Sequence, residues 1–143
     1  MKAESNIQPS MSYEFEICGD NVNITFFDNI VEVEPVDETP RYTYDIYHMT
    51  VRNRPTLISD LDSNISMWIL AARTAEYTQL ATAIREKRDL LLSETDYLMT
   101  QDYPISVADR ELMIAYRQAL RDIPEQSGFP FDVIFPLKPN NKI

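Results

Sequence analysis

Few residues in this chain have a type and spacing that could support catalysis. His48 is the only histidine and Cys18 the only cysteine, and neither stands beside another residue of a nucleophile–base pair or a metal site. The two glycines, Gly19 and Gly128, are too few for a loop that cradles phosphate. No serine stands in a G-x-S-x-G turn. The sequence therefore predicts a protein that is not an enzyme and that has no catalytic residues, no metal site and no cofactor.

Four glutamates occupy alternate positions in two short segments, Glu14 and Glu16 in the first and Glu32 and Glu34 in the second. Such a row could contribute oxygen ligands to a cation, but a metal site normally needs a more convergent set. The interpretation we favour is a solvated sheet face, on which like charges keep an edge strand from pairing with other chains.

The charge of the chain is unevenly distributed. The formal net charge is −10, and residues 1–40 carry nine acidic residues and a single lysine. No cluster of lysine and arginine exists that could follow a phosphate backbone, so nucleic acid is not an expected partner. No apolar run approaches the length of a membrane span, and the first ten residues lack the apolar segment of a secretion signal. We therefore expect a soluble, cytosolic protein without a membrane partner.

A set of arginines and aspartates in the C-terminal half predicts a structural ion-pair network. Arg88 lies on the same helical stripe as Ile84, Leu91 and Leu92, so either the helical register is wrong, or Arg88 has a partner that neutralises it, or the stripe faces something other than the protein's own core. We expect Arg88 to join the two C-terminal helices, and we expect Arg88→Ala to lower the melting temperature well beyond Arg110→Ala. The full predicted network is Arg85, Arg88, Asp89, Asp96, Asp102, Arg117, Arg121 and Asp122, with Asp96, Asp102 and Asp122 as the candidate partners of Arg88.

The elements that position these residues begin with strands. After a leader over residues 1–10 that we expect to be disordered, apolar residues alternate with polar ones through residues 13–17 and 22–26, with a turn at Gly19 between them. Two further alternating runs, at 30–34 and 41–51, complete an antiparallel β-meander over residues 11–54. Cys18 is predicted to be a small core residue of this meander.

Helical periodicity begins after Pro55. Leu57, Leu61, Ile65, Trp68 and Ala72 form one apolar stripe, and a second stripe runs from residue 77 to about residue 94. The two stripes are out of phase at residues 73–76. Either the chain bends there and forms two helices, or one long helix presents different faces to different neighbours.

The last part of the chain predicts a second helix and an extended tail. Ser106 is expected to be the N-cap, with Asp109 three residues later, and Pro124 to end the helix. The proline- and phenylalanine-rich segment that follows should be an extended strap, either laid over the helices or offered to another protein as a polyproline-type segment. The predicted fold class is thus α+β, with the β-meander followed by a helical domain over residues 55–143 that contains one long helix or two, a helical hairpin and the strap.

Residues 84–106, "IREKRDLLLSETDYLMTQDYPIS", and 116–136, "YRQALRDIPEQSGFPFDVIFP", resemble the C-terminal domain of bacteriophage tail assembly chaperones, which are related to tail-fibre assembly proteins. The resemblance covers about residues 80–137 and leaves the strand-rich part outside. The sequence departs from the family pattern at Tyr97 and Phe135, where tryptophan is common, but both positions keep an aromatic ring. The matching residues are Arg85, Arg88, Asp89, Leu91, Leu92, Asp96, Asp102, Tyr116, Arg117, Leu120, Arg121, Asp122, Ile123 and Pro124.

The resemblance implies a phage or prophage protein that binds a tail or tail-fibre protein in the bacterial cytoplasm and shields its apolar surface until assembly. The alternative is a structural or adaptor protein that remains in the virion tail. A homo-oligomer is left open. Aromatic residues would provide the partner-binding surface, although the same rings could instead fill the protein's own core. The predicted partner-binding residues are Trp68, Tyr97, Phe129, Phe131 and Phe135.

Overall fold

The computed structural model describes residues 2–36 and 39–139 and has an α+β fold, as predicted. The chain divides into two compact units, Met1–Glu76 and Tyr77–Ile143. The boundary therefore lies within a helix and not at residue 54, where the sequence pattern changes from strand to helix. Each unit has a separate buried core.

The first unit contains a four-stranded antiparallel sheet with the strand order β1-β4-β3-β2. Gly19 has a φ of +62° between β2 and β3, a backbone conformation that glycine adopts without steric cost. The register of β3 and β4 shifts after Asp28, where Asn29 also has a positive φ of 51°. The strands are β1 (Lys2–Ser5), β2 (Tyr13–Cys18), β3 (Asn21–Val36) and β4 (Thr39–Arg52).

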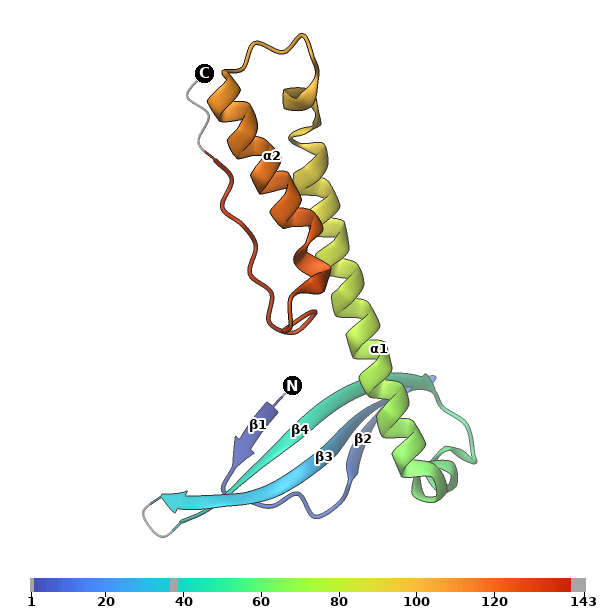
Figure 1. The fold of residues 1–143 in the computed structure, drawn as a ribbon. Coiled ribbons are helices and arrows are strands. Elements are labelled where there is room, and N and C mark those ends of the chain that lie inside the picture. Colours follow the sequence, from blue (N-terminus) through green and yellow to red (C-terminus); the bar gives the residue numbers. More distant parts are fainter. Residues whose placement is uncertain (1, 37–38, 140–143) are drawn as a thin grey trace. The chain divides into compact units, whose positions relative to one another are not determined.

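One face of this sheet is covered by the first part of helix α1 (Leu57–Ser93), and the core lies between them (Figure 1). Period-two alternation places Val22, Ile24 and Phe26 on the covered face, where each is at most 1% exposed. Leu57 and Leu61 of α1 are equally buried. The predicted strand pattern and the first predicted helical stripe therefore meet in one core, which also includes Ala72 and the half-buried Trp68.

Two predictions for the first unit are wrong. Residues 2–5, expected to belong to a disordered leader, form β1 and pair with β4; Met1 lies outside the described residues. Cys18, expected in the core, is exposed. Cys18 pairs with Asn21 at the end of the edge strand, and its side chain lies on the sheet face opposite the helix because the pleat alternates.

The two apolar stripes of α1 allowed either a bend at residues 73–76 or an unbroken helix there that presents different faces to different neighbours. Two helical segments meet in α1 at a kink at Asn64, which has non-helical φ and ψ, and residues 73–76 continue the second segment without interruption. Residues up to Ala72 pack into the core of the first unit, while Ile84, Leu91 and Leu92 pack into the core of the second. The segment of α1 after Asn64 packs into both cores in turn, and this change of neighbours accounts for the phase shift. No helix in the described part of the chain is long and apolar enough to cross a membrane.

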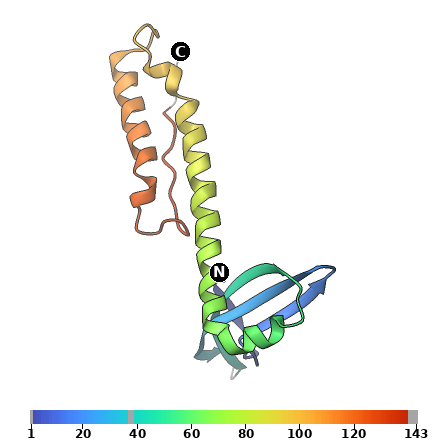
Figure 2. The same ribbon diagram turned by 90° about the vertical axis from the view of Figure 1, so that its right-hand side faces the viewer.

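The second unit consists of the rest of α1, helix α2 (Val107–Arg121), two 3₁₀ turns and an irregular segment over residues 126–139, here called the strap, which turns at 127–131 and has no regular structure over 133–139. In both Figure 1 and Figure 2, α2 and the strap run beside the second part of α1. The 3₁₀ turns are η1 (Asp96–Met99) and η2 (Ile123–Glu125). The buried core is formed by Leu98, Met113, Tyr116, Leu120 and Ile123.

The predicted ends of α2 are confirmed. The Asp109 amide donates to Ser106 Oγ at 3.0 Å, so Ser106 is the N-cap. The Ser106 hydroxyl also donates to the Asp109 carboxylate at 2.7 Å. At the other end the helix stops at Arg121, and Pro124 lies in η2, where it cannot continue the α-helical hydrogen bonding.

Candidate functional site

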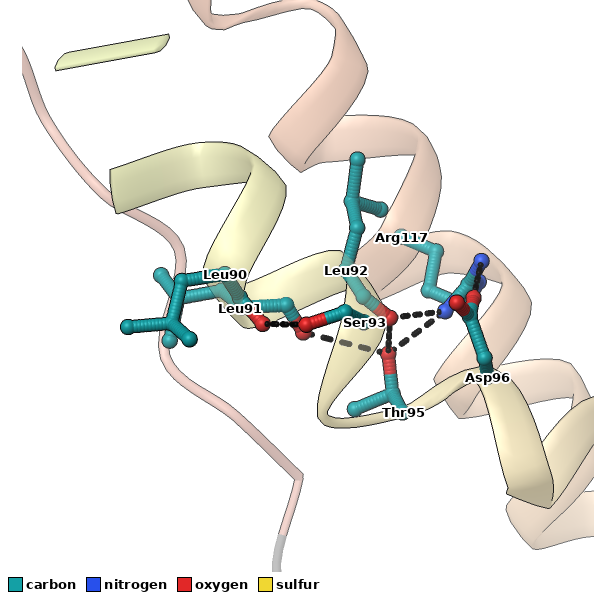
Figure 3. A network of polar contacts seen from close by, with 7 residues as sticks. All are labelled: Leu90, Leu91, Leu92, Ser93, Thr95, Asp96 and Arg117. Atoms are coloured by element: carbon teal, nitrogen blue, oxygen red, sulfur yellow. Dashed lines mark hydrogen bonds and ion pairs between the residues drawn. The ribbon is translucent and has the colours of Figure 1, made fainter. Parts of the chain in front are cut away.

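The turn between α1 and η1 is held by Arg117 of α2 (Figure 3). One guanidinium nitrogen, Nη1, donates to the Leu92 carbonyl and to Thr95 Oγ1, both at 2.6 Å. The other, Nη2, donates to the Asp96 carboxylate at 2.6 Å. The Arg117 side chain is only 11% exposed, so these three acceptors compensate most of its lost hydration.

Thr95 is the buried polar centre of this network, with no exposed surface. Its hydroxyl lies 2.9 Å from the Leu92 carbonyl and 3.2 Å from the Leu91 carbonyl and accepts from Arg117. The last carbonyls of a helix lack partners within the helix and carry its partial negative charge. The hydroxyl and the guanidinium together supply those partners, and so they join the C-terminal end of α1 to α2.

The prediction that Arg88 joins the C-terminal helices is wrong. Arg88 forms its ion pair with Asp89, the next residue, at 2.7 Å. Asp96 is bound by Arg117, and Asp122 accepts from Gln118. A side chain at the edge of an apolar stripe can reach a neighbouring carboxylate on the same helix, so the stripe position of Arg88 does not require a partner on another element.

The remaining members of the predicted network are dispersed. Arg85 lies over the ring of Phe129, with its Cζ 5.2 Å from the ring centroid. Within residues 2–36 and 39–139, neither Asp102 nor Arg121 forms an ion pair. Arg110, taken as a neutral reference, donates to the carbonyls of Thr100 and Tyr103 in the loop before α2. The sequence pattern gave no sign of Thr95, because threonine near a helix end is common and its burial depends on α2.

The strap is anchored by its inward-facing side chains. Phe129, Val133 and Phe135 pack against the core of the second unit. The ammonium group of Lys87 lies 4.2 Å from the ring centroid of Phe135, an arrangement that favours a cation over an aromatic face. These contacts hold the strap along the surface formed by α1 and α2.

The backbone of the strap is held by the side-chain amide of Gln126. Its Nε2 donates to the Ile134 carbonyl at 2.8 Å, and its Oε1 accepts from the Ile134 amide at 2.9 Å. The amide thus provides the pair of hydrogen bonds that a neighbouring strand would provide. The turn between these residues also contains Gly128, where a Cβ atom would lie 2.2 Å from the Asp132 carbonyl oxygen. Only glycine fits there without movement of the backbone.

The strap also carries exposed apolar side chains. Phe131 is 61% exposed, Ile134 77% and Leu137 94%. Phe131 has an edge contact with Tyr77, with ring centroids 6.2 Å apart. Beside Ile134, a hollow of about 590 Å³ is lined by Ala119 of α2 and by residues of the strap. The outward face of the strap, defined here as Phe131, Ile134 and Leu137, is the candidate functional surface.

The five predicted partner-binding residues differ in exposure. Tyr97 is 51% exposed and stacks edge-on with Tyr103, and Phe131 is also exposed. Phe129 and Phe135 are half-buried in the core of the second unit. Trp68 is half-buried against the core of the first unit. Of the predicted aromatic residues, Tyr97 and Phe131 are therefore the two with most of their surface free for a partner.

A shifted pKa in the second unit belongs to a residue of its core. Burial raises the pKa of Tyr116 in the core, with a smaller contribution from the negative charge of Glu94. That phenol therefore stays neutral over the physiological range. Within the described residues, no group of three histidine, cysteine, aspartate or glutamate side chains is placed to hold a metal ion.

Residues 81–140 match the family model described as phage tail assembly chaperone protein. The match confirms the resemblance found in the C-terminal half and covers nearly all of the second unit. It supports a tail assembly chaperone role, and that family is not a class of enzymes. No curated protein and no solved structure matches the chain.

Proposed function

We propose that this protein is a non-enzymatic assembly chaperone that holds a phage tail or tail-fibre protein on the outward face of its strap. The observation that carries the proposal is the division of the strap into two sides. Phe129, Val133 and Phe135 are packed inward, while Phe131 and Ile134 remain more than half exposed. Exposed apolar side chains grouped on one segment are typical of a protein-binding surface.

The anchoring of the strap favours binding. Association loses free energy when flexible side chains and loops become ordered, and a segment already fixed loses less. The Gln126 amide fixes the backbone at Ile134, and the inward aromatic rings fix the segment on either side. The outward residues would therefore meet a client with little reorganisation.

The surroundings of the outward face fit an apolar contact with a polar rim. Asp132 lies between Phe131 and Ile134 in sequence and is exposed, and Ser127 and Gln126 line the adjacent hollow. Interfaces commonly combine an apolar centre with polar groups at the edge. The modest size of the apolar set suits a complex that must later release its client, as assembly requires.

The test is co-purification of the tagged full chain with the tail proteins encoded by the same phage. The double variant Phe131→Ser, Ile134→Ser should lose most of the captured tail protein. Ile114→Ser is a matched control, because Ile114 is a 53% exposed isoleucine on α2. Serine and isoleucine have similar helix propensity, so the control should remain folded. Equal capture by the double variant and the wild-type chain would contradict the proposal.

Mass spectrometry of purified phage particles distinguishes the chaperone role from the alternative role as a structural or adaptor protein. A chaperone should be absent from the particles and present with its client in lysate of infected cells. Stoichiometric presence in the tail would instead identify a structural component and would overturn the chaperone role.

A further inference from the structure

Strand β2 leaves one backbone edge of the sheet open. It is the last strand in the order β1-β4-β3-β2, and its other edge pairs with β3 along its whole length, from Tyr13 opposite Phe26 to Cys18 opposite Asn21. Among residues 2–36 and 39–139, no further strand pairs with β2. An open edge presents unpaired amide and carbonyl groups to which another extended segment can bond.

The two faces of β2 have different chemistry. Phe15 and Ile17 lie opposite the buried Ile24 and Val22, so they extend the apolar face of the sheet beyond its covered part. Phe15 is nevertheless 45% exposed and Ile17 60%. On the other face, Glu14 and Glu16 are exposed and alternate with these apolar residues.

A second copy of the chain fits this edge poorly. In an antiparallel pair, residues directly opposite each other project from the same face. A register that places Phe15 opposite Phe15 or Ile17 of the other copy brings Glu14 opposite Glu16, or Glu16 opposite Glu16, on the other face. Like charges directly opposite each other destabilise a strand pair, whereas opposite charges stabilise it.

We propose that the open edge of β2 binds an extended, basic polypeptide segment as an added strand. The segment would alternate apolar residues with lysine or arginine, the apolar residues lying beside Phe15 and Ile17 and the cations beside Glu14 and Glu16. Main-chain hydrogen bonds to β2 would supply affinity, and the alternating side chains would supply selectivity. The site lies in the first unit, outside the family match, and is independent of the function proposed for the strap.

A synthetic peptide tests the site directly. The probe is an acetylated, fluorescent peptide of about eight residues that alternates valine with lysine, long enough to span the strand. Its affinity for the full chain is measured by fluorescence anisotropy and compared with that of a valine–glutamate peptide. We expect the lysine peptide to bind about tenfold tighter or more, because each cross-strand charge pair changes from repulsive to attractive. Equal affinities would overturn the proposal.

Charge reversal distinguishes the edge from the general acidity of the protein. Glu14→Lys, Glu16→Lys should weaken binding of the lysine peptide about tenfold and should favour the glutamate peptide. The control Glu32→Lys, Glu34→Lys makes the same change in net charge at exposed positions of β3 and should change affinity less than about twofold. Equal losses in both variants would show that only net charge matters and would contradict the site. The neutral variant Glu14→Gln, Glu16→Gln gives an intermediate affinity if charge pairing operates and preserves side-chain shape.

Two further measurements test the strand geometry. Two methylated forms of the lysine peptide are compared: one carries N-methyl groups on the backbone nitrogens of its lysines, the other on those of its valines. Only one of the two should lose binding, because alternate amides of a strand face its partner. Loss in neither sample would exclude an added strand. Sedimentation of the wild-type chain and of Phe15→Thr tests whether a second copy occupies the edge. We expect no dimer through this edge. A dimer in the wild-type chain that is lost in Phe15→Thr would assign the edge to a second copy and would overturn the proposal.

Discussion

The two units each contain a part of helix α1, and the two parts pack against different kinds of structure. In the first unit, α1 packs against a sheet whose backbone groups bond to one another, and the core between them consists of apolar side chains and the Tyr13 ring, whose hydroxyl donates to Asp62. In the second unit, α1 packs against one helix and an irregular strap, and polar side chains close the contacts: Arg117 and Thr95 at the helix end and Gln126 at the strap.

The difference follows from the requirement that backbone polar groups find partners. A sheet satisfies those groups within itself, whereas a helix end and an extended segment outside a sheet cannot. Side chains must then supply the missing partners. The second unit should therefore be more sensitive to single polar substitutions than the first, where one such contact joins Tyr13 to Asp62.

The largest effect is expected from Arg117→Ala. The substitution removes the donors that serve Leu92, Thr95 and Asp96, and it should lower the free energy of unfolding of the second unit by roughly 2–4 kcal/mol. Arg88→Ala breaks the ion pair with Asp89, a side chain that is 61% exposed, and should lower the free energy of unfolding by less than about 1 kcal/mol. Denaturant unfolding followed by circular dichroism measures both. A larger loss for Arg88→Ala would contradict the assignment of Arg117 as the cation that joins the helices.

Gly128→Ala should cost about 1–3 kcal/mol, because the new methyl group collides with the backbone of Asp132. The strap would have to shift, so hydrogen exchange of its amides should accelerate. Gly19→Ala is the control in the first unit: a positive φ makes it strained, but nothing lies within 4 Å of a Cβ there. Unchanged strap exchange in Gly128→Ala would show that the turn adapts without cost.

Gln126→Ala should cost about 1–2 kcal/mol through loss of the two hydrogen bonds to Ile134. Exchange of the Ile134 amide should accelerate, since Gln126 is its acceptor. Gln118→Ala removes a comparable side chain whose amide donates to the Asp122 carboxylate on α2, and it should leave the strap unchanged. The same Ile134 exchange rate in all three proteins would contradict the bridging role of Gln126.

The smallest effect concerns alkaline pH. The hydrogen bond to Asp62 raises the pKa of Tyr13, and burial and the Asp62 charge act in the same direction. A phenol whose pKa is higher in the folded state contributes stability below the unfolded value near 10, and that stability is lost as pH rises through the folded value. Burial raises the pKa of Tyr47 too, so the first unit should weaken above about pH 10.

Tyr13→Phe should lower stability by about 1 kcal/mol at pH 8 and should reduce the alkaline loss of the first unit. Tyr116→Phe is the control, since it changes a phenol of the second unit. Unfolding at pH 8 and at pH 11, followed in each variant, measures the difference. An unchanged alkaline loss in Tyr13→Phe would show that Tyr13 does not contribute to it.

The regular parts of the fold were predictable from the sequence for a physical reason. The side-chain period of two is a local property, so it predicts a strand from residues such as Val22, Ile24 and Phe26. The helical period predicts one face of α1 in the same way, from Leu57, Leu61 and Ala72. Ser106 identified the start of α2 because a cap needs only residues three positions apart. The resemblance in the C-terminal half was confirmed by the match over residues 81–140.

The predictions that failed depended on contacts distant in sequence. Helical position favours Arg88 as the joining cation, but whether Arg88 or Arg117 joins the helices depends on how α2 crosses the end of α1. Cys18 was placed in the core by its neighbours, although it lies at the end of an edge strand. The bond between Gln126 and Ile134 spans eight residues of irregular chain, which no periodic pattern describes.

The most direct test of the central claim is hydrogen exchange of the full chain, alone and in the complex purified with its tail protein. The claim is that an anchored strap presents Phe131, Ile134 and Leu137 to that protein. The account predicts slower exchange at the amides of residues 131–135 in the complex and unchanged exchange around Ile114 of α2. Unchanged exchange along the strap, with slowing confined to other parts of the chain, would contradict it.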